Sequence, residues 1–518
     1  MNVERRSTMA PAKTGPLRGL ARPAVVTLTI ATCTLASKLA GFGRELIMAR
    51  YFGVTADVDA LLVAITPYWV FILVVGEALR FQFIPKLTAE ETRYGLAAFW
   101  RASAVLVRRT AVIGIVLSTT LALSARWWVP AIAPGASKAT LELAIRLAWL
   151  LSPIVAASLV GNVLVAVLNA RGRLLRSAIA DLAYNAFGVP FVLLFAGTLG
   201  IRAAAWGWTG GYVLYCLVLL GAFAGRRLPW RGSRPGAALG LLDAAPLMFI
   251  AAATPITMAV DRLVASRLPT GSIAALNYAF KLFFFPVGIL VGALGAVSYP
   301  RLARSFASQR QVEAGNAVAA DLTIYLVLAT PLSAFFAVAS LEIVELFFRR
   351  GVFDSAAARL TADCLRAYSF GILPYGAGVL LMRANLAANA RRGPVVATSV
   401  ALATNVLLDV VLSGTLAAPG VALAFGCAGL VSAVLYGAQL LRRARGAIPD
   451  VSVMLAVLGC TVAGIAALRI VPSGGGSPLA WLLARGGLFA VVVAGGYAAT
   501  GVWSRTRATL LRSAEATS

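Results

Sequence analysis

The chain has 518 residues, of which 60% are apolar and only 13% are charged, and its mean hydropathy is +0.85. Too few polar side chains are present to cover the surface of a water-soluble protein of this length. The composition therefore excludes a soluble enzyme or binding domain and predicts a polytopic membrane protein. The formal net charge of +26 would indicate a nucleic-acid ligand in a soluble protein, but in a membrane protein its meaning depends on where the basic residues lie.

About fourteen apolar stretches are long enough to cross a hydrocarbon layer roughly 30 Å thick. In chain order they lie near 25–49, 58–83, 103–124, 139–169, 175–199, 201–224, 239–265, 272–299, 316–341, 360–389, 394–413, 417–441, 451–471 and 477–502. Stretches of this length and composition predict membrane-spanning helices, so the expected fold class is all-α.

Arginine and lysine residues gather in alternate connections between these stretches. Those on the basic side include Arg5, Arg22, Lys86, Arg108, Arg171, Arg226, Arg301, Arg391, Arg442 and Arg505. Cytoplasmic loops carry an excess of basic residues, so this pattern predicts that both termini are cytoplasmic. The charge is thus first a topology signal and second an attraction for membrane lipids or diphosphate head groups, and no nucleic-acid partner is expected.

The five cysteines all fall in predicted spans without a C-x-x-C pair, and the chain contains no histidine. A disulfide framework and a zinc site are therefore not indicated. The lack of histidine excludes Ser-His and Cys-His nucleophiles and histidine proton relays.

The second and eighth spans resemble each other. Pro67 interrupts the second span, which ends in Phe83-Ile84-Pro85, and Pro286 interrupts the eighth, which ends in Tyr299-Pro300. Such internal repeats build many secondary transporters, with the substrate site between two lobes. Prolines are also common in membrane helices that are unrelated to each other. The alternative that the two spans resemble each other by chance therefore stays open.

The repeat predicts two lobes of transmembrane helices around a central cavity. The expected division is a cytoplasmic basic N-terminus at 1–24, an N-terminal lobe at 25–224 with spans 1–6, and a C-terminal lobe at 239–445 with spans 7–12. Two accessory spans at 451–502 and a cytoplasmic tail at 503–518 would follow.

Charged residues inside the first spans are candidates for a functional site, because each charge costs at least about 2.5 kcal/mol at a helix centre. Lys38, Arg44 and Glu45 share the first span, and their spacing predicts that they lie on about the same face. Asp59 opens the second span after a short turn, close enough in sequence to neutralise one of these cations.

Two further groups lie in later spans. Glu77 and Arg80 are three residues apart and thus neighbours on one helix face, either as part of a site or as a pair that merely neutralises itself. Lys281 has no acidic neighbour in sequence. A buried cation needs an anion, so its partner is predicted to be a substrate phosphate or a carboxylate from the other lobe.

Acidic residues also occur in the C-terminal half, at Asp261, Asp321 and Asp409. Asn405 precedes Asp409 by one helical turn, so the pair presents two oxygens on one face. That arrangement suits a hard cation such as Na⁺ or a proton. A structural Asn-Asp hydrogen bond between helices is the alternative.

The sequence resembles the MurJ/MviN family over nearly its whole length. The similar segments are the run from Ser37 to Glu45, Ala49 to Gly53, Phe83 to Pro85, Asn277 to Gly288 and Phe347 to Phe353. That family belongs to the multidrug/oligosaccharidyl-lipid/polysaccharide exporter superfamily. It moves lipid II, the undecaprenyl-linked peptidoglycan precursor, to the outer leaflet of the bacterial cytoplasmic membrane for cell-wall biogenesis.

By this resemblance, Arg44 and Asp59 match essential cavity residues of the family. Lys38 and Lys281 stand where the family has arginines, which keeps the charge but loses the bidentate fork that suits a diphosphate. The family's second-span arginine falls near Phe71 or Ile72, so it is missing here, and Arg80 is the residue expected to substitute for it from another turn. The predicted cavity set is Lys38, Arg44, Glu45, Asp59, Glu77, Arg80 and Lys281.

The resemblance also implies a cation site at Asp261, Asn405, Asp409 and Val421, with Val421 as a backbone ligand. The family's threonine falls at Phe425. No other cofactor is implied, and coupling to Na⁺, to H⁺ or to the membrane potential is expected.

The implied activity is transport of a lipid-linked sugar diphosphate by alternating access, without a covalent step, with cell-wall synthesis proteins as partners. Three alternatives remain: export of another polyprenyl-linked oligosaccharide, cation-coupled export of a small molecule, or a membrane glycosyltransferase. The last rests on Asp57-Val58-Asp59, a D-x-D sequence of the kind that holds a metal.

Overall fold

The computed structural model describes residues 16–221, 223, 245–390, 392–444, 446, 448–468 and 478–515. Over these ranges the chain forms eighteen α-helices, one π-helix and no strand, which confirms the all-α prediction. The N-terminal segment before residue 16 and most of the connection at 222–244 lie outside the described residues.

The first group of helices packs around one part of the apolar core, which includes Tyr68, Phe83 and Phe99. Its members are α1 (Pro16–Phe52), α2 (Ala56–Val70), the π-helix η1 (Phe71–Val75), α3 (Gly76–Leu123), α4 (Ala125–Ile132), α5 (Lys138–Leu151), α6 (Pro153–Ala170), α7 (Leu174–Leu199) and α8 (Arg202–Gly221).

The second group packs around Phe283, Tyr325 and Tyr368. Its members are α9 (Ala245–Ala265), α10 (Ser272–Ala307), α11 (Gln311–Val338), α12 (Ser340–Phe348), α13 (Ser355–Ala387), α14 (Arg392–Leu416) and α15 (Ala418–Leu441). We call these two groups the N lobe (α1–α8) and the C lobe (α9–α15).

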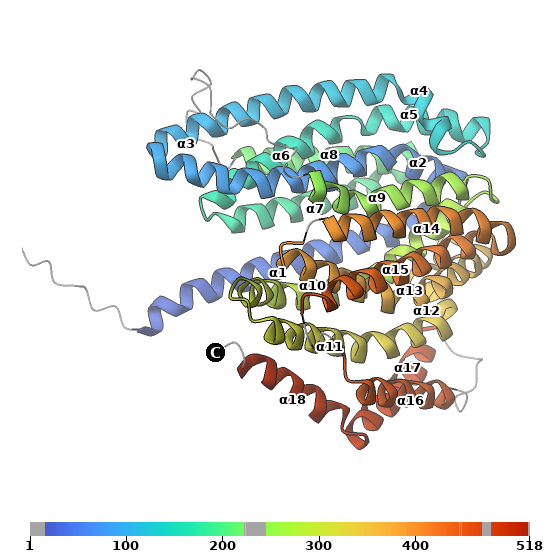
Figure 1. The fold of residues 1–518 in the computed structure, drawn as a ribbon. Coiled ribbons are helices and arrows are strands. Elements are labelled where there is room, and N and C mark those ends of the chain that lie inside the picture. The colour runs from blue at the N-terminus through green and yellow to red at the C-terminus, as the bar shows by residue number, and fades with distance from the viewer. Residues whose placement is uncertain are drawn as a thin grey trace, which may run out of the picture.

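The final helices are α16 (Val451–Ala467), α17 (Pro478–Ala499) and α18 (Val502–Glu515). They lie along α11, on the side of the C lobe away from the N lobe (Figure 1). Tyr497 on α17 donates a hydrogen bond to the carbonyl of Val327 at 2.8 Å, and Phe489 packs on Phe335. The packing fits the expected accessory pair, and the domain limits remain a prediction.

Eleven helical runs among the described residues are long and apolar enough to cross a membrane. One of them, Ala56–Leu123, contains two of the predicted spans, because the chain reverses within it at Gly95 (Figure 1). Gly95 has φ 79°, a conformation that residues with a Cβ rarely adopt. With the long α1 and the shorter α16 added, these runs account for the fourteen predicted spans.

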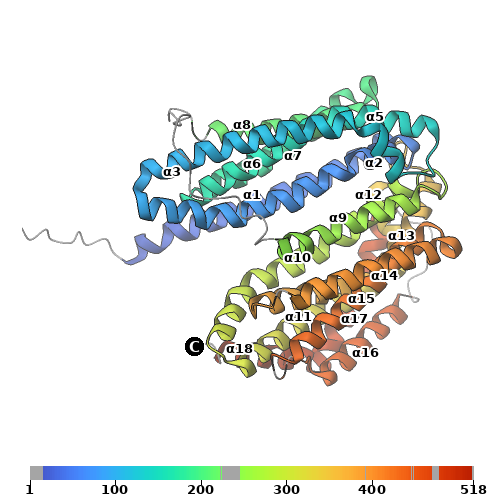
Figure 2. The same cartoon turned by 45° about the horizontal axis from the view of Figure 1, so that its top comes forward.

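The two lobes contact each other at one end of the molecule, where α2 packs on α9 and α10 and α1 packs on α12, and their ribbons diverge from that end (Figure 2). Here the backbone N–H of Val352 donates to the carbonyl of Arg50 at 2.9 Å. Gly351 adopts φ 63°, and a Cβ at this position would lie 2.3 Å from that carbonyl oxygen. We call this end the closed end; it begins at the α1–α2 turn and includes the loop before α13.

The interrupted second span has a specific local cause. Pro67 lies inside α2, and the helix loosens into the π-turn Phe71–Val75 one turn later. Proline cannot donate the usual backbone hydrogen bond, and π-turns of this kind often mark functional sites. The eighth span, α10, stays an α-helix on both sides of Pro286 and Pro300, without a π-turn, so the two related spans differ in this detail.

Candidate functional site

Arg44 is the centre of a polar cluster inside the N lobe. Its side chain is only 8% exposed. One guanidinium nitrogen donates to the hydroxyl of Tyr184 at 2.5 Å, and another lies 3.4 Å from Glu45 Oε1. The guanidinium also faces the rings of Tyr184 and Trp208, at 5.4 and 5.3 Å from their centroids. Packing against α7 and α8 therefore fixes the position of this charge.

Glu45 links Arg44 to the C lobe. Lys281 Nζ on α10 lies 3.9 Å from Glu45 Oε1 and 5.9 Å from the ring centroid of Trp69. The sequence left two partners open for Lys281, and the structure supplies the carboxylate from the other lobe. Two cations from opposite lobes thus share one carboxylate.

Asp59 has a different role from the one expected. Its oxygens accept hydrogen bonds from the backbone N–H groups of Gly271 and Ala274, both at 2.7 Å. Gly271 is the N-cap of α10 and has no side chain to cap the helix, so a carboxylate of the N lobe caps a helix of the C lobe. The prediction that Asp59 neutralises a cation of the first span is wrong, because the start of α10 takes both of its oxygens.

The remaining predicted cavity residues do not all join the cluster around Arg44. Lys38 lies on the same continuous helix as Arg44 and Glu45 but is exposed, whereas they are buried. Its place in the cavity set stays a prediction. Arg80 donates to the hydroxyl of Tyr215 at 3.0 Å. The side chain of Glu77 lies outside the described residues, and its pairing with Arg80 stays a prediction. Phe71 and Ile72, at the place of the missing arginine, lie in the π-turn and are partly buried.

Three tyrosines join the two arginines of the N lobe. The rings of Tyr184 and Tyr212 are 4.5 Å apart, and those of Tyr212 and Tyr215 are 6.3 Å apart. Sequence reasoning missed them because they lie on α7 and α8, more than 130 positions from the arginines that they contact. The candidate site residues were selected from the sequence by their charge. A tyrosine hydroxyl is uncharged, so this criterion does not find it.

The predicted cation site is partly assembled. Asp261 on α9 interacts with Asp409 on α14, and Asn405 Nδ2 lies 3.4 Å from Asp409 Oδ1. Three buried oxygens here lack a hydrogen-bond donor among the described residues: Asp261 Oδ1, Asn405 Oδ1 and Asp409 Oδ2. Two carboxylates and an amide oxygen suit a hard cation, so these residues fit one.

The other two positions of the predicted cation site are Val421 and Phe425, and only Val421 could supply a ligand. Val421 is fully buried on α15, and its carbonyl as a ligand stays a prediction. Phe425 packs its ring against Phe280, Phe283 and Tyr375, at centroid distances of 5.5, 5.7 and 5.2 Å. An aromatic ring supplies no oxygen, so any ligand set at this site is smaller than the one implied by resemblance.

Arg262 is a buried charge that the sequence analysis did not select. It follows Asp261 on α9 and is 7% exposed. Its guanidinium donates to the hydroxyl of Thr66 on α2 at 2.6 Å, which is a contact between the lobes. Its position next to Asp261 in sequence was a usable signal, because a basic residue inside a span needs a partner.

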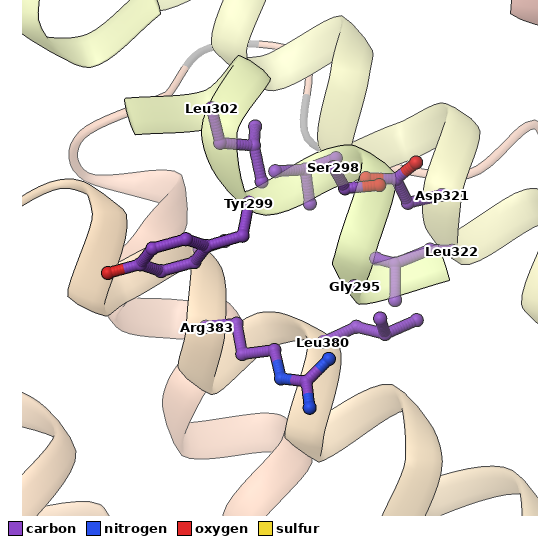
Figure 3. A pocket seen from close by; sticks show the side chains of 10 residues that line it. Gly295, Ser298, Tyr299, Leu302, Asp321, Leu322, Leu380 and Arg383 are labelled. Atoms are coloured by element: carbon purple, nitrogen blue, oxygen red, sulfur yellow. The ribbon is translucent and has the colours of Figure 1, made fainter. Parts of the chain in front are cut away.

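A separate polar cluster lies between α10, α11 and α13. Arg301 is 3.0 Å from Asp321 Oδ1, and Arg383 donates to the carbonyl of Val291 at 3.0 Å. Figure 3 shows Asp321 and Arg383 on the walls of a small pocket that Tyr299 also lines. Asp321 therefore has its own basic partner, apart from Asp261 and Asp409.

The D-x-D sequence does not form a paired carboxylate site. Asp57 is exposed, whereas Asp59 is 6% exposed and holds the start of α10. A metal site needs both carboxylates turned to one point, so the geometry gives the glycosyltransferase alternative no support.

Comparisons with known proteins agree with this architecture. A family model described as lipid II flippase MurJ matches residues 48–473. A probable lipid II flippase MurJ of Rhizobium tropici is 27% identical over 432 residues, which is 80% of each chain. The lipid II flippase MurJ of Burkholderia cenocepacia is 26% identical over 430 residues, 80% of this chain and 81% of that protein.

Two solved structures show the same fold. A lipid II flippase MurJ in an inward closed conformation has a TM-score of 0.77 at 19% identity and covers 91% of this chain and 99% of its own. An inward-facing MATE family transporter has a TM-score of 0.70 at 13% identity, over 80% of this chain and 97% of its own. Because the family model spans most of the sequence, this chain belongs to the lipid II flippase MurJ family of membrane transporters.

Proposed function

We propose that this protein moves lipid II from the inner to the outer leaflet of the bacterial cytoplasmic membrane by alternating access. The observation that carries the proposal is the charge imbalance between the lobes, where Arg44 and Lys281 share the single carboxylate of Glu45. Two buried donors beside them, Arg44 Nε and Trp208 Nε1, have no acceptor among the described residues. An anionic ligand such as a diphosphate supplies both the charge and the acceptors.

In this mechanism the sugar-diphosphate head group enters between the lobes while the prenyl tail stays in lipid. The phosphates compete with Glu45 for Arg44 and Lys281. Rocking of the lobes breaks the contacts of the closed end, including the Asp59 cap on α10. A membrane potential that is negative inside favours outward movement of an anion by about 2.3 kcal/mol per charge per 100 mV. No covalent bond is made or broken.

We place both termini in the cytoplasm, which puts the closed end on the outer side. Coupling to Na⁺ or H⁺ would use Asp261, Asn405 and Asp409, whose free oxygens would hold the cation. The cation would neutralise the negative charge of the two carboxylates. Membrane lipids surround the chain, and cell-wall synthesis proteins are the proposed protein partners.

Export of another polyprenyl-linked oligosaccharide is the second candidate. It is favoured by the apolar π-turn at Phe71 and Ile72, where the family resemblance implies an arginine, and by lysine in place of arginine at position 281. A lysine ammonium binds phosphate as a point charge rather than through a bidentate fork. Both candidates share the diphosphate and differ in the sugar.

Complementation in bacteria depleted of their own lipid II flippase tests the proposal. Wild type is compared with Arg44→Ala and Asp59→Ala, and lipid II that is accessible from outside is measured. Each variant has a matched control: Arg310→Ala removes an exposed arginine paired with Glu313, and Asp354→Ala removes the N-cap of α13 within one lobe.

We expect rescue by wild type and both controls, and loss of rescue with Arg44→Ala and Asp59→Ala. A wild-type protein that inserts and expresses well but fails to rescue would reject lipid II as the cargo. The second candidate then predicts rescue of a strain that lacks the exporter of a different polyprenyl-linked glycan.

A further inference from the structure

The acidic cluster of Asp261, Asn405 and Asp409 is connected to the contact between the lobes. We propose that Arg262, through its hydrogen bond to Thr66, is a positioning residue that couples this cluster to the closed end. The inference rests on the proposed alternating access, and its added content is the link between a bound cation and the lobe contact.

The bond between Arg262 and Thr66 joins the lobes directly. Arg262 Nη1 lies 2.6 Å from Thr66 Oγ1. Arg262 is 7% exposed and Thr66 is 3% exposed. Thr66 also donates its hydroxyl hydrogen to the carbonyl of Leu62 at 2.9 Å, which turns its lone pairs toward the arginine. The acceptor thus comes from the N lobe and the charge from the C lobe.

Arg262 has a competing partner on its own helix. The adjacent Asp261 attracts its guanidinium electrostatically. The other titratable groups that interact electrostatically with Arg262 are Tyr368 on α13 and Lys281 on α10. Asp261 Oδ1 accepts no hydrogen bond among the described residues, so this oxygen is available to the guanidinium.

The space needed to exchange partners is present. A cavity of about 30 Å³ is lined by both Asp261 and Arg262, with Asn277, Phe280 and Tyr368 on its walls. That volume accommodates about two water molecules. This free volume lies beside both Arg262 and Asp261, so the arginine side chain has room to change its orientation near the carboxylate.

These contacts give the coupling a direction. A cation held by Asp261 and Asp409 neutralises the carboxylate that competes for Arg262, so the arginine stays with Thr66 and the closed end stays closed. Without the cation, Asp261 draws the arginine away and the lobe contact weakens. A cation that binds one state better than the other shifts the populations accordingly.

Distance measurements between spin labels test this link. Labels are placed at Lys138→Cys on α5 and Ala356→Cys on α13, two exposed positions on opposite lobes at the closed end, after replacement of the five native cysteines. Distances are recorded in NaCl and in choline chloride at equal ionic strength, in nanodiscs. The variants are Thr66→Val, Thr66→Ser, Arg262→Gln and Arg262→Lys.

The matched control is Thr323→Val. Thr323 is equally buried and donates to the carbonyl four residues before it, as Thr66 does, but lies within the C lobe. We expect Na⁺ to increase the short-distance population in wild type, Thr66→Ser and Thr323→Val. In Thr66→Val and Arg262→Gln the closed-to-open ratio should fall about tenfold, as expected for loss of a hydrogen bond from a charged donor, and the response to Na⁺ should vanish. Arg262→Lys should keep part of the response to Na⁺.

The coupling is rejected if Thr66→Val responds to Na⁺ as wild type does, or if wild type itself gives no response. Lipid II movement is measured separately in proteoliposomes of the same proteins. Loss of the Na⁺ response in Thr66→Val together with absence of lipid II movement in wild type would reject the proposed cargo and leave the coupling standing.

Discussion

A buried guanidinium keeps its position only when oxygens or aromatic rings surround it, and Arg44 has both. Tyr184 receives its shortest hydrogen bond, at 2.5 Å, while Glu45 is more distant at 3.4 Å. The hydroxyl orients the arginine without neutralising it, which leaves its charge for a ligand. Tyr215 does the same for Arg80 at 3.0 Å.

Tyr184→Phe should therefore impair transport while the protein still folds. The substitution removes the oxygen next to Arg44 and keeps the ring under its guanidinium. Loss of a hydrogen bond to a charged group predicts about a tenfold or larger fall in the transport rate. The measurement is lipid II flipping in proteoliposomes, with Tyr94→Phe as control because Tyr94 is 68% exposed. An unchanged rate in Tyr184→Phe would show that the arginine is positioned by its other contacts.

At the scale of elements, α10 begins in an unusual way. Gly271 has φ 90°, and a Cβ there would lie 2.6 Å from Val54 Cγ1 of the other lobe. The glycine thus allows the α1–α2 turn to approach, and the missing cap is supplied by Asp59 in the first turn of α2. One helix start is completed only while the lobes touch.

Substitution of Asp59 should weaken the closed end in a graded way. Asp59→Asn keeps one acceptor oxygen, whereas Asp59→Ala removes both, and loss of an N-cap side chain costs about 0.5–2 kcal/mol. We expect the closed-to-open ratio to follow the order wild type, Asn, Ala in the spin-label experiment described above. An Ala variant that remains as closed as wild type would contradict the capping role.

The π-turn is followed directly by a close contact between α3 and α6, at Gly76. A Cβ at Gly76 would lie 2.3 Å from Nδ2 of Asn162, whose amide donates to the carbonyl of Ser158. Gly76→Ala should therefore destabilise the protein by about 1–3 kcal/mol through overpacking, although alanine is normally the better helix former.

Thermal unfolding in detergent checks this prediction. Asn162→Ala in the same chain should recover part of the loss, because it removes the group that collides. Gly292→Ala on α10 serves as control, since a Cβ there meets nothing within 4 Å. Equal stability of Gly76→Ala and Gly292→Ala would argue against the contact.

At the scale of the whole molecule, the sequence predicted what depends on composition and failed where distant segments meet. The spans follow from apolar length alone, and the two predicted at 58–83 and 103–124 stay separate in the structure because the backbone is non-helical at Gly95 between them. Lys281 was correctly expected to need an anion, since an unpaired cation inside a span is costly. Asp59 was assigned the wrong partner because backbone N–H groups at a helix start carry no sequence signal. Thr66 and Arg262 are 196 positions apart, and no local pattern joins them.

The orientation of the whole molecule in the membrane follows from the basic residues and is open to direct measurement. Tyr94 lies beside the Gly95 reversal, on the side to which the positive-inside rule assigns the cytoplasm, and Lys138 lies at the closed end. In a protein without its native cysteines, Tyr94→Cys should resist a membrane-impermeant maleimide in intact cells and react after lysis. Lys138→Cys should react in both conditions, because its position is exposed at the opposite end. The reverse pattern would place the closed end in the cytoplasm, and a cargo that must leave the cell would then meet an entrance on the wrong side.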